Sequence, residues 1–323
     1  MESGNRTATD EQPGAPAGPE PGRFIEVAEG VYAWIQRDGT WWINNAGLVA
    51  GDQSMLLVDT CTTERRTREL LAEVAGVSAG RPLRYAVNTH HHGDHTFGNS
   101  LLPEETCLIG HHQMRESLLA DRTLLAFPPY WTPTPDFGDL TPRVPTLTIQ
   151  SDVSVHLGDR HAELLHPGYA AHTYGDVIVW VPDVRVLFAG DLLFPGHTPM
   201  LLAGAPSGAI RVLDWIASFD AETIVPGHGE VIERARIADV LDEHRRYYEF
   251  VVAAAAKGMA AGLTPLEVAR TTDLGEFADL LDPERFVLNV HSAYAEHAGE
   301  RANRAGAFKD ALTWLGAPLH TKV

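Results

Sequence analysis

Short apolar runs separated by polar turns recur along the chain from residue 24 onwards, and their spacing predicts two series of strands and helices. The first series comprises an antiparallel meander of strands at 24–36, 43–51 and 54–60, a helix at 62–76 and a strand at 83–89. The second comprises strands at 147–158, 161–168, 176–182, 184–191 and 222–229, with a helix near 211–219. Two such similar series favour two packed halves.

Three stretches depart from this pattern. Residues 1–22 are rich in Pro, Gly, Glu and Ala and hold almost no large apolar side chains, so we expect a disordered tail. Residues 121–145 hold six prolines among several aromatic residues, which makes a regular element improbable and leaves the role of this insert open. Beyond residue 233 the pattern is helical, with a capping box formed by Thr264 and Glu267 around Pro265.

The domain boundaries follow from these changes of pattern. We expect one α/β domain over 23–234 and a C-terminal helical extension over 235–323 that packs on the same domain. The apolar segment at 251–256 fits two arrangements, internal packing or a homodimer contact. No repeat of short period is present.

Composition narrows the classes of partner. The chain has 323 residues, 44% of them hydrophobic, which is enough for a sizeable core, and 25 Lys and Arg against 43 Asp and Glu, a net charge of -18. An acidic surface repels nucleic acid and anionic membranes, so we expect neither as a partner. Cys61 and Cys107 alone form no disulfide framework, no apolar run approaches a membrane span, and no secretion signal is evident. We therefore expect a cytoplasmic protein.

The strongest chemical signal is the segment Thr89-His90-His91-His92-Gly93-Asp94-His95, which directly follows an apolar strand. Alternate residues leaving a strand end can point to one side, so His90 and His92 can bind one metal ion while Asp94 and His95 turn toward a second. Imidazole and carboxylate both suit zinc. A solvated polar loop is the competing interpretation if the segment has no further partners.

Three further candidates lie at strand ends: His172, Asp191 and His228. Asp191 follows a run of apolar residues, where a lone carboxylate is costly without a cation or strong donors. Taken singly, Asp191 can cap a turn and each histidine can be an ordinary loop residue. Taken together with His90, His92, Asp94 and His95, they favour a dinuclear metal site.

In this ligand pattern the chain resembles the metallo-β-lactamase superfamily over roughly residues 24–233. The pattern is His-x-His-x-Asp-His followed by a later His, a later Asp and a final His, and it is complete and in order here. The resemblance implies a four-layer αββα sandwich. It also implies one metal held by His90, His92 and His172, a second held by Asp94, His95 and His228, and Asp191 between them. Asp59, after an earlier strand, would orient the ligand loop, although a turn-forming role fits it equally.

Departures from the family pattern reduce the number of candidate substrates and reactions. Zinc β-lactamases usually carry Cys or Ser where Asp191 stands, and the diiron flavoprotein branch usually carries Glu where His92 stands, so both activities are disfavoured. What remains is hydrolysis of a thioester, ester or lactone by a metal-bound hydroxide, with Asp94 orienting it and accepting its proton. We expect two Zn²⁺ ions, although these oxygen and nitrogen ligands also accept iron or manganese.

Residues 263–297 resemble the corresponding part of actinorhodin-type second-ring cyclases with thioesterase activity, from aromatic polyketide pathways. This resemblance implies a small-molecule substrate, an aromatic polyketide thioester carried on acyl carrier protein. Aromatic residues on expected rim loops offer stacking surface for such a substrate, or else anchor those loops: Trp41, Trp42, Tyr130 and Trp131. His197, just beyond Asp191, can donate to the substrate or be a free loop histidine.

Three other interpretations stay open. The chain can be a lactonase, a glyoxalase II-like enzyme or another hydrolase outside polyketide metabolism. Within the polyketide interpretation, the reaction can be hydrolysis or ring closure, and the product separates the two. The competing class is a metal-containing binder without turnover, against which the complete set of seven ligands argues.

Overall fold

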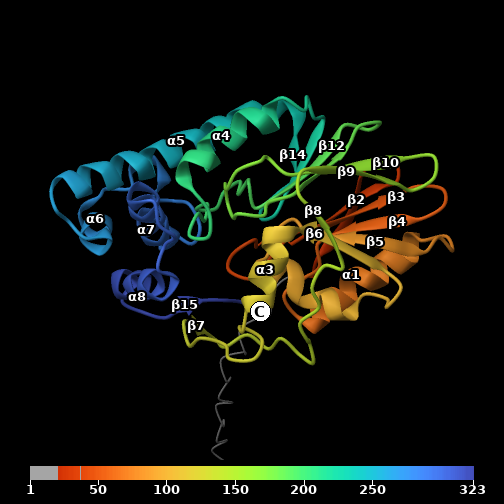
Figure 1. Ribbon diagram of the computed structural model, residues 1–323, viewed down its shortest axis with the longest axis horizontal. Coiled ribbons are helices and arrows are strands. Elements are labelled where there is room, and N and C mark those ends of the chain that lie inside the picture. The colour runs from red at the N-terminus through yellow and green to blue at the C-terminus, as the bar shows by residue number, and fades with distance from the viewer. Residues whose placement is uncertain (1–20, 37) are drawn as a thin grey trace, which may run out of the picture.

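Two β-sheets pack face to face in the computed structural model, which describes residues 21–36 and 38–323 (Figure 1). The tail expected at 1–22 therefore lies almost wholly outside the described residues. The first sheet has seven strands: β1 (Arg23–Ala28), β2 (Val31–Ile35), β3 (Ala46–Ala50), β4 (Met55–Val58), β5 (Leu83–Val87), β6 (Cys107–His111) and β8 (Leu147–Ile149). Strands β1 to β4 form the predicted antiparallel meander, and β4, β5, β6 and β8 are parallel.

The second sheet has six strands in the order β14-β13-β12-β11-β10-β9. They are β9 (Asp152–His156), β10 (His161–Leu165), β11 (Ile178–Val181), β12 (Val186–Gly190), β13 (Thr223–Pro226) and β14 (Ile232–Glu233). Only β12 and β13 are parallel neighbours within it. The apolar stretch predicted at 147–158 is therefore divided, because β8 joins the first sheet and β9 begins the second.

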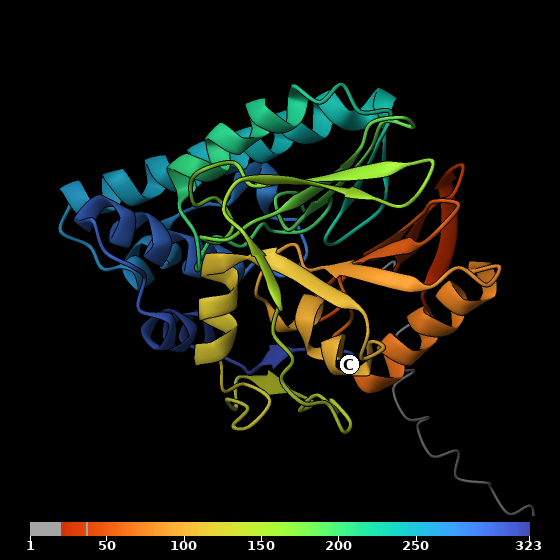
Figure 2. The same cartoon turned by 45° about the vertical axis from the view of Figure 1, so that its right-hand side comes forward.

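Helices cover the outer face of each sheet (Figures 1 and 2). On the side of the first sheet are α1 (Glu64–Val77), α2 (Gly93–Thr96), the 3₁₀ helix η1 (Phe97–Leu101) and α3 (His112–Ala120). On the side of the second sheet are α4 (Pro206–Ala217), α5 (Arg234–Ala260), α6 (Pro265–Thr271), the 3₁₀ helix η2 (Gly275–Phe277), α7 (Arg285–Ala298) and α8 (Arg304–Leu315). The four-layer αββα arrangement predicted from the sequence is confirmed.

Three clusters of buried apolar side chains hold these layers together. One lies between the sheets and includes Val49 and Val179; a second joins the first sheet to α1 through Leu70 and Val74. The third joins the second sheet to α4, α5, α7 and α8. Removing such surface from water is worth about 25 cal/mol per Å², so each interface contributes to stability.

The C-terminal helices form local structure that the sequence predicts well. The capping box at the start of α6 is confirmed, because the Thr264 side chain accepts from the Glu267 amide and the Glu267 carboxylate accepts from the Thr264 amide. In α5, Val251 and Ala255 are buried inside the molecule. Among the described residues no single helix is long and apolar enough to cross a membrane. Helices α5 and α6 have the required length and apolar character only when taken together, and they are bent by 115° relative to each other.

The proline-rich insert holds one short strand. Trp131–Thr132 (β7) pairs in parallel with Leu319–His320 (β15), near the C-terminal end of the chain (Figure 2). The expectation of no regular element at 121–145 is therefore wrong for these two residues. Trp131 is buried and packs edge-on against Trp41 and Trp42, which supplies apolar contacts that the local sequence does not reveal.

Candidate metal centre

Parallel strands bring the candidate ligands to one edge of the two sheets. In the first sheet, β4 is followed by Asp59 and β5 by the segment that carries His90, His92, Asp94 and His95. In the second sheet, the parallel strands β12 and β13 are followed by Asp191 and His228. The carboxyl ends of parallel neighbours share an edge, so the ligands meet there.

Glycine makes the close approach of β12 and β13 possible. A Cβ atom on Gly227 would lie 1.9 Å from Asp191 Oδ1, and one on Gly190, whose φ is +54°, would lie 2.8 Å from the Thr89 side chain. Any larger residue at 227 would displace the Asp191 carboxylate. The glycines of the runs at 184–191 and 222–229 therefore keep Asp191 in place.

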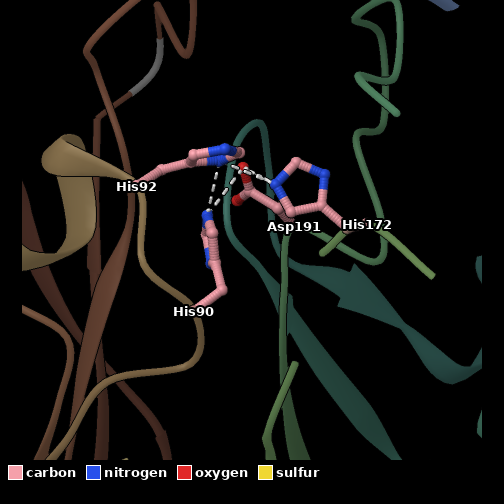
Figure 3. Close-up of side chains that lie close together, drawn as sticks. All are labelled: His90, His92, His172 and Asp191. Atoms are coloured by element: carbon pink, nitrogen blue, oxygen red, sulfur yellow. Dashed lines mark hydrogen bonds and ion pairs between the residues drawn. The ribbon is translucent and has the colours of Figure 1, made fainter. Parts of the chain in front are cut away.

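Four side chains form the first group: His90, His92, His172 and Asp191 (Figure 3). His92 Nδ1 lies 3.0 Å from His90 Nε2 and 2.9 Å from His172 Nε2. Asp191 Oδ2 lies 3.5 Å from His90 Nε2 and 3.3 Å from His172 Nε2. Three imidazoles and one carboxylate thus point at a common centre.

Asp94, His95 and His228 form the second group. Asp94 Oδ2 lies 3.2 Å from His228 Nε2 and 3.8 Å from His95 Nε2. Asp191 belongs to both groups by distance, because its Oδ1 lies 3.1 Å from His95 Nε2 and its Oδ2 lies 3.5 Å from His228 Nε2. All seven residues that the sequence singles out as candidate ligands are therefore brought together.

The other ring nitrogen of four histidines meets an oxygen atom. His172 Nδ1 lies 2.6 Å from Met200 O and His228 Nδ1 lies 2.8 Å from Gly39 O. A backbone carbonyl only accepts, so in both rings Nδ1 carries a proton and Nε2 is the nitrogen that faces the cluster. This is the arrangement that a metal-binding histidine requires.

Asp59 orients the remaining two of these histidines. Its Oδ2 accepts from His95 Nδ1 at 2.8 Å and from Thr89 Oγ1 at 2.8 Å, while its Oδ1 accepts from the Thr89 amide at 2.7 Å. Since the Thr89 hydroxyl donates to Asp59, it accepts from His90 Nδ1, which lies 3.0 Å away. One buried carboxylate thus turns Nε2 of both His90 and His95 toward the cluster.

The donor set fits divalent cations. Four nitrogen ligands around zinc lie about 3.3 Å apart, from tetrahedral geometry and a zinc–nitrogen distance of about 2.0 to 2.1 Å. The contacts in the first group, 2.9 to 3.5 Å, match that spacing. His92 Nδ1 faces His90 Nε2 and His172 Nε2, and both of these nitrogens carry a lone pair that points into the cluster. A proton on His92 Nδ1 can form a hydrogen bond with only one of them, so the other contact joins two nitrogens without a proton between them. His95 Nε2 and Asp191 Oδ1 are both buried and lie 3.1 Å apart, yet they are not aligned for a hydrogen bond with each other or with any other described residue, a deficit that a cation removes.

Ionisation follows burial and the two carboxylates. Burial lowers the pKa values of His90, His92 and His172, so these rings stay neutral at pH 7. Burial also lowers the pKa of His228, but Asp191 and Asp94 outweigh it and raise that pKa to about 9. The pKa of His95 is likewise raised, because Asp191, Asp59 and Asp94 surround it. In the absence of a cation, protons on these two rings balance the carboxylates.

Metal uptake is therefore expected to release protons. At pH 7.5 His228 is protonated without metal and must lose its proton to offer Nε2 as a ligand, so apparent affinity should rise with pH toward its pKa of about 9, and loss of the proton on His95 adds to the rise. The slope is about tenfold per pH unit for each proton released. Titration calorimetry of zinc binding in buffers of different ionisation enthalpy measures this number, and an affinity that is flat between pH 7 and 9 would contradict the assignment.

An aromatic pocket opens onto the cluster. The empty volume of the pocket, including the part open to solvent, is about 460 Å³. Four residues of the cluster line it: His92, Asp94, Asp191 and His228. Three of the four aromatic residues predicted to contact substrate line it too: Trp41, Trp42 and Trp131. Arg66, buried in α1, donates to the carbonyl oxygens of Trp42 and Asn44 at 2.7 and 3.0 Å and so holds this loop against the first sheet.

Two predicted site residues lie elsewhere. Tyr130 is absent from the pocket lining, because its ring stacks on Phe308 at 5.0 Å. His197 is buried with Nδ1 2.9 Å from Pro195 O and Nε2 2.8 Å from Asp38 O, so neither nitrogen faces the pocket. Burial lowers its pKa to about 4, and the neutral ring donates to only one of these carbonyls. The prediction that His197 donates to substrate is corrected: it supports the loop whose Gly39 carbonyl accepts from His228.

The sequence missed one wall of the pocket. Arg285, Arg304 and Phe308 line it from α7 and α8, and Phe194 and Met200 line it from the loop that follows β12. These residues carry no motif and lie far from the histidine segment in sequence. The only available signal was the presence of arginine in an acidic chain, which does not place a residue at a site.

Comparisons with known proteins agree with this geometry. A sequence model of the metallo-β-lactamase superfamily matches residues 39–228. The human acyl-coenzyme A thioesterase MBLAC2 is 28% identical over 241 residues, 64% of this chain and 78% of that protein. The metallo-beta-lactamase type 2 of Bacillus cereus is 26% identical over 205 residues, 61% of this chain and 71% of that protein. The hydroxyacylglutathione hydrolase of Methylococcus capsulatus is 30% identical over 150 residues, which are 45% of this chain and 48% of that protein.

Solved structures share the fold. The metallo-beta-lactamase from Pontibacter korlensis superposes with a TM-score of 0.57 at 16% identity, over 71% of this chain and 99% of that one. The DIM-1 metallo-beta-lactamase superposes with a TM-score of 0.57 at 18% identity, over 72% and 99%. At these identities the likeness concerns the fold alone.

Proposed function

Since the chain belongs to the metallo-β-lactamase superfamily, we propose that it is a metallo-hydrolase that holds two divalent cations, zinc in the first instance, and cleaves a thioester. The observation that carries the proposal is the convergence of five imidazoles and two carboxylates at the floor of an aromatic pocket. Relatives named for thioester hydrolysis, an acyl-coenzyme A thioesterase and a hydroxyacylglutathione hydrolase, support this choice of bond.

The residues suggest a division of roles. His90, His92 and His172 would hold one cation, Asp94, His95 and His228 the other, and Asp191, which contacts both groups, would link them. Bound there, divalent cations lower the pKa of water and polarise a carbonyl oxygen. Asp94 lines the pocket, and its pKa is held below the ordinary range because His95 and His228 outweigh the effect of burial. It is therefore ionised at neutral pH and able to accept the proton of the attacking water.

The chemical step is balanced by water alone. A carbon–oxygen bond forms at the thioester carbonyl, the carbon–sulfur bond breaks, and the proton taken up by Asp94 passes to the leaving thiolate. No serine or cysteine nucleophile is required. The buried tryptophans exclude bulk water from the carbonyl, which strengthens every electrostatic interaction at the site.

The acyl group is proposed to be aromatic, and a carbonyl-rich polyketide carried on coenzyme A or acyl carrier protein is the specific candidate. Three indole rings line the pocket and would favour an aromatic acyl group, because an aromatic pair is worth about 0.5 to 1.5 kcal/mol beyond burial of area. The likeness of residues 263–297 to second-ring cyclases supports this candidate. Ring closure before release is the second candidate reaction, and it needs the same polarised carbonyl.

The metal-loaded protein is expected to prefer a thioester over its oxygen analogue. Aromatic acyl thioesters, matched oxygen esters, lactones and a β-lactam are compared by release of thiol or acid, and the thioester should lead by about tenfold or more in kcat/KM. The control is protein stripped by a chelator, which should lose nearly all turnover and regain it with zinc. Equal or better turnover of lactone or β-lactam would contradict the thioesterase assignment, and mass spectrometry of the product separates free acid from a new ring.

A further inference from the structure

Three of the pocket residues that the sequence missed, Arg285, Arg304 and Phe308, come from outside the segment shared with the family. The family model ends at residue 228, whereas Arg285 begins α7 and Arg304 begins α8. In Figure 1, α8 lies beside the β7–β15 pair, whose strand β7 carries Trp131, and α7 lies next to α8. This part of the wall therefore belongs to the C-terminal helices of this chain, which the family model does not cover.

A second pocket adjoins the first along this wall. Its empty volume, including the part open to solvent, is about 690 Å³. His92, Met200 and Arg304 line both pockets. Arg301 and Tyr174 line its far part. A continuous surface thus runs from the seven-residue cluster, past Met200 and Arg304, to Arg301.

The two arginines of the second pocket are available to a ligand. Both are exposed, and neither forms an ion pair with any residue that the structure describes. The Arg301 guanidinium lies over the Tyr174 ring, 4.2 Å from its centroid, which fixes the side chain while leaving its N–H groups free. Arg304 lies 5.9 Å from the Phe308 ring centroid. Arg285 differs, because it is buried, pairs with Asp282 at 2.7 Å and donates to Thr198 O.

Charge makes this pair unusual for the chain. Acidic residues outnumber basic ones by 18, yet no Asp or Glu is among the residues that line the second pocket. An acidic surface repels an anionic substrate, so a cationic pair beside the cluster would both attract such a substrate and orient it. Two guanidinium groups offer the forked N–H geometry that matches the oxygens of phosphate.

We propose that Arg301 and Arg304 bind a phosphate group of the carrier to which the acyl group is attached, while the thioester carbonyl lies at the seven-residue cluster. The inference rests on the proposed thioesterase function and extends it to the leaving group. The aromatic pocket receives the acyl portion, and the carrier arm passes Met200 into the second pocket. Phosphate is present both in coenzyme A and in the phosphopantetheine arm of a carrier protein, so substrate fragments are needed to separate the two sources.

The test compares thioesters that share one acyl group. The carriers are coenzyme A, phosphopantetheine, which keeps only the arm phosphate, and N-acetylcysteamine, which has none. For the double variant Arg301→Gln, Arg304→Gln, KM for the coenzyme A thioester should rise about 10- to 100-fold more than KM for the N-acetylcysteamine thioester, as expected for losing two charge-assisted contacts. A comparable rise with phosphopantetheine identifies the arm phosphate; a rise with coenzyme A alone identifies its nucleotide phosphates. Equal changes with all three carriers, or no change, would overturn the proposal.

Two further variants sharpen the comparison. Arg84→Gln removes an exposed arginine from β5, away from both pockets, and should leave the three KM values at those of the wild type. Arg301→Lys with Arg304→Lys keeps both charges but not the forked geometry, so it should recover part of the discrimination. Full recovery of it by lysine, together with a comparable loss in Arg84→Gln, would assign the effect to net charge and overturn the subsite.

A direct binding measurement separates this proposal from the thioesterase assignment. Free coenzyme A is titrated into metal-loaded protein, and its binding is followed by tryptophan fluorescence, since Trp41, Trp42 and Trp131 line the adjoining pocket. Binding by the wild type that weakens at least tenfold in the double glutamine variant supports the subsite even if no thioester is hydrolysed. Equal binding by both proteins, or by neither, overturns the subsite even if thioesters are hydrolysed.

Discussion

Asp191→Asn is expected to lower kcat/KM by about 1,000-fold or more, equivalent to about 4 kcal/mol of transition-state stabilisation. Asp191 contacts ligands of both groups through separate oxygens, Oδ1 toward His95 and Oδ2 toward His172. Asparagine keeps the shape but replaces one oxygen with an N–H₂ group, which cannot be a ligand and carries no charge. We therefore expect the purified variant to hold less than the full two equivalents of metal, as measured by elemental analysis.

The fold of this variant should survive, because the change is isosteric. Asp52→Asn makes the same replacement in the loop that exchanges hydrogen bonds with Asp159, away from the cluster, and serves as the matched control. Thermal unfolding of the metal-free variant close to that of the metal-free wild type would show that the loss is chemical. Full metal content and wild-type turnover in Asp191→Asn would remove Asp191 from the ligand set.

Asp59→Asn is expected to weaken metal binding by about 10- to 100-fold although residue 59 makes no contact with a cation in the proposed arrangement. The Asp59 carboxylate accepts from His95 Nδ1 and Thr89 Oγ1 through Oδ2. If the asparagine oxygen keeps the hydrogen bond from the Thr89 amide, the N–H₂ group of the asparagine faces His95 Nδ1. It then favours the His95 tautomer that is protonated on Nε2. That tautomer has no lone pair for a metal, in the manner of the misoriented histidine of a catalytic triad that has lost its aspartate.

Asparagine is the informative substitution because of the backbone at this position. Residue 59 has φ of +62°, a left-handed conformation that Asn and Asp tolerate and alanine does not. Asp59→Asn thus removes the hydrogen bonds without adding backbone strain, whereas Asp59→Ala does both. A competition assay with a chromophoric chelator measures the metal affinity of each. If Asp59→Asn binds metal as the wild type does and only Asp59→Ala is impaired, then Asp59 serves the turn and not the histidines.

The ligand set was predictable because its members follow strands that the sequence marks clearly. Asp191 and His228 each end an apolar run, and the segment from His90 to His95 directly follows another. Parallel neighbours end at one edge of a sheet, so residues that follow such strands are close in space whatever their separation in sequence. The orienting role of Asp59 was implied by the family resemblance alone, and its place beside the histidine segment follows from the parallel pairing of β4 and β5.

The surroundings of the cluster were less predictable, for two physical reasons. His197 follows Asp191 by six positions, but the intervening loop reverses and turns its ring toward Asp38 and Pro195, which local sequence does not specify. Tyr130 and Trp131 are adjacent and both rings pack on Phe308, at 5.0 and 5.4 Å, yet only Trp131 lines the pocket, which the local sequence does not specify. Arg304 and Phe308 share one face of α8 by their spacing of four, but only the tertiary fold brings that face to the cluster.

The short β7–β15 ladder has a consequence for how the protein comes into being. It joins Trp131 to Leu319 across more than half of the chain, and Tyr130 O accepts a hydrogen bond from the Leu319 amide. Contacts of such large sequence separation form late, because the loop they close is long. During synthesis, all seven residues of the cluster therefore emerge before Leu319, and before Arg285, Arg304 and Phe308, which line the pocket above them. The candidate ligands of a nascent chain would thus be complete before the walls of its pocket are.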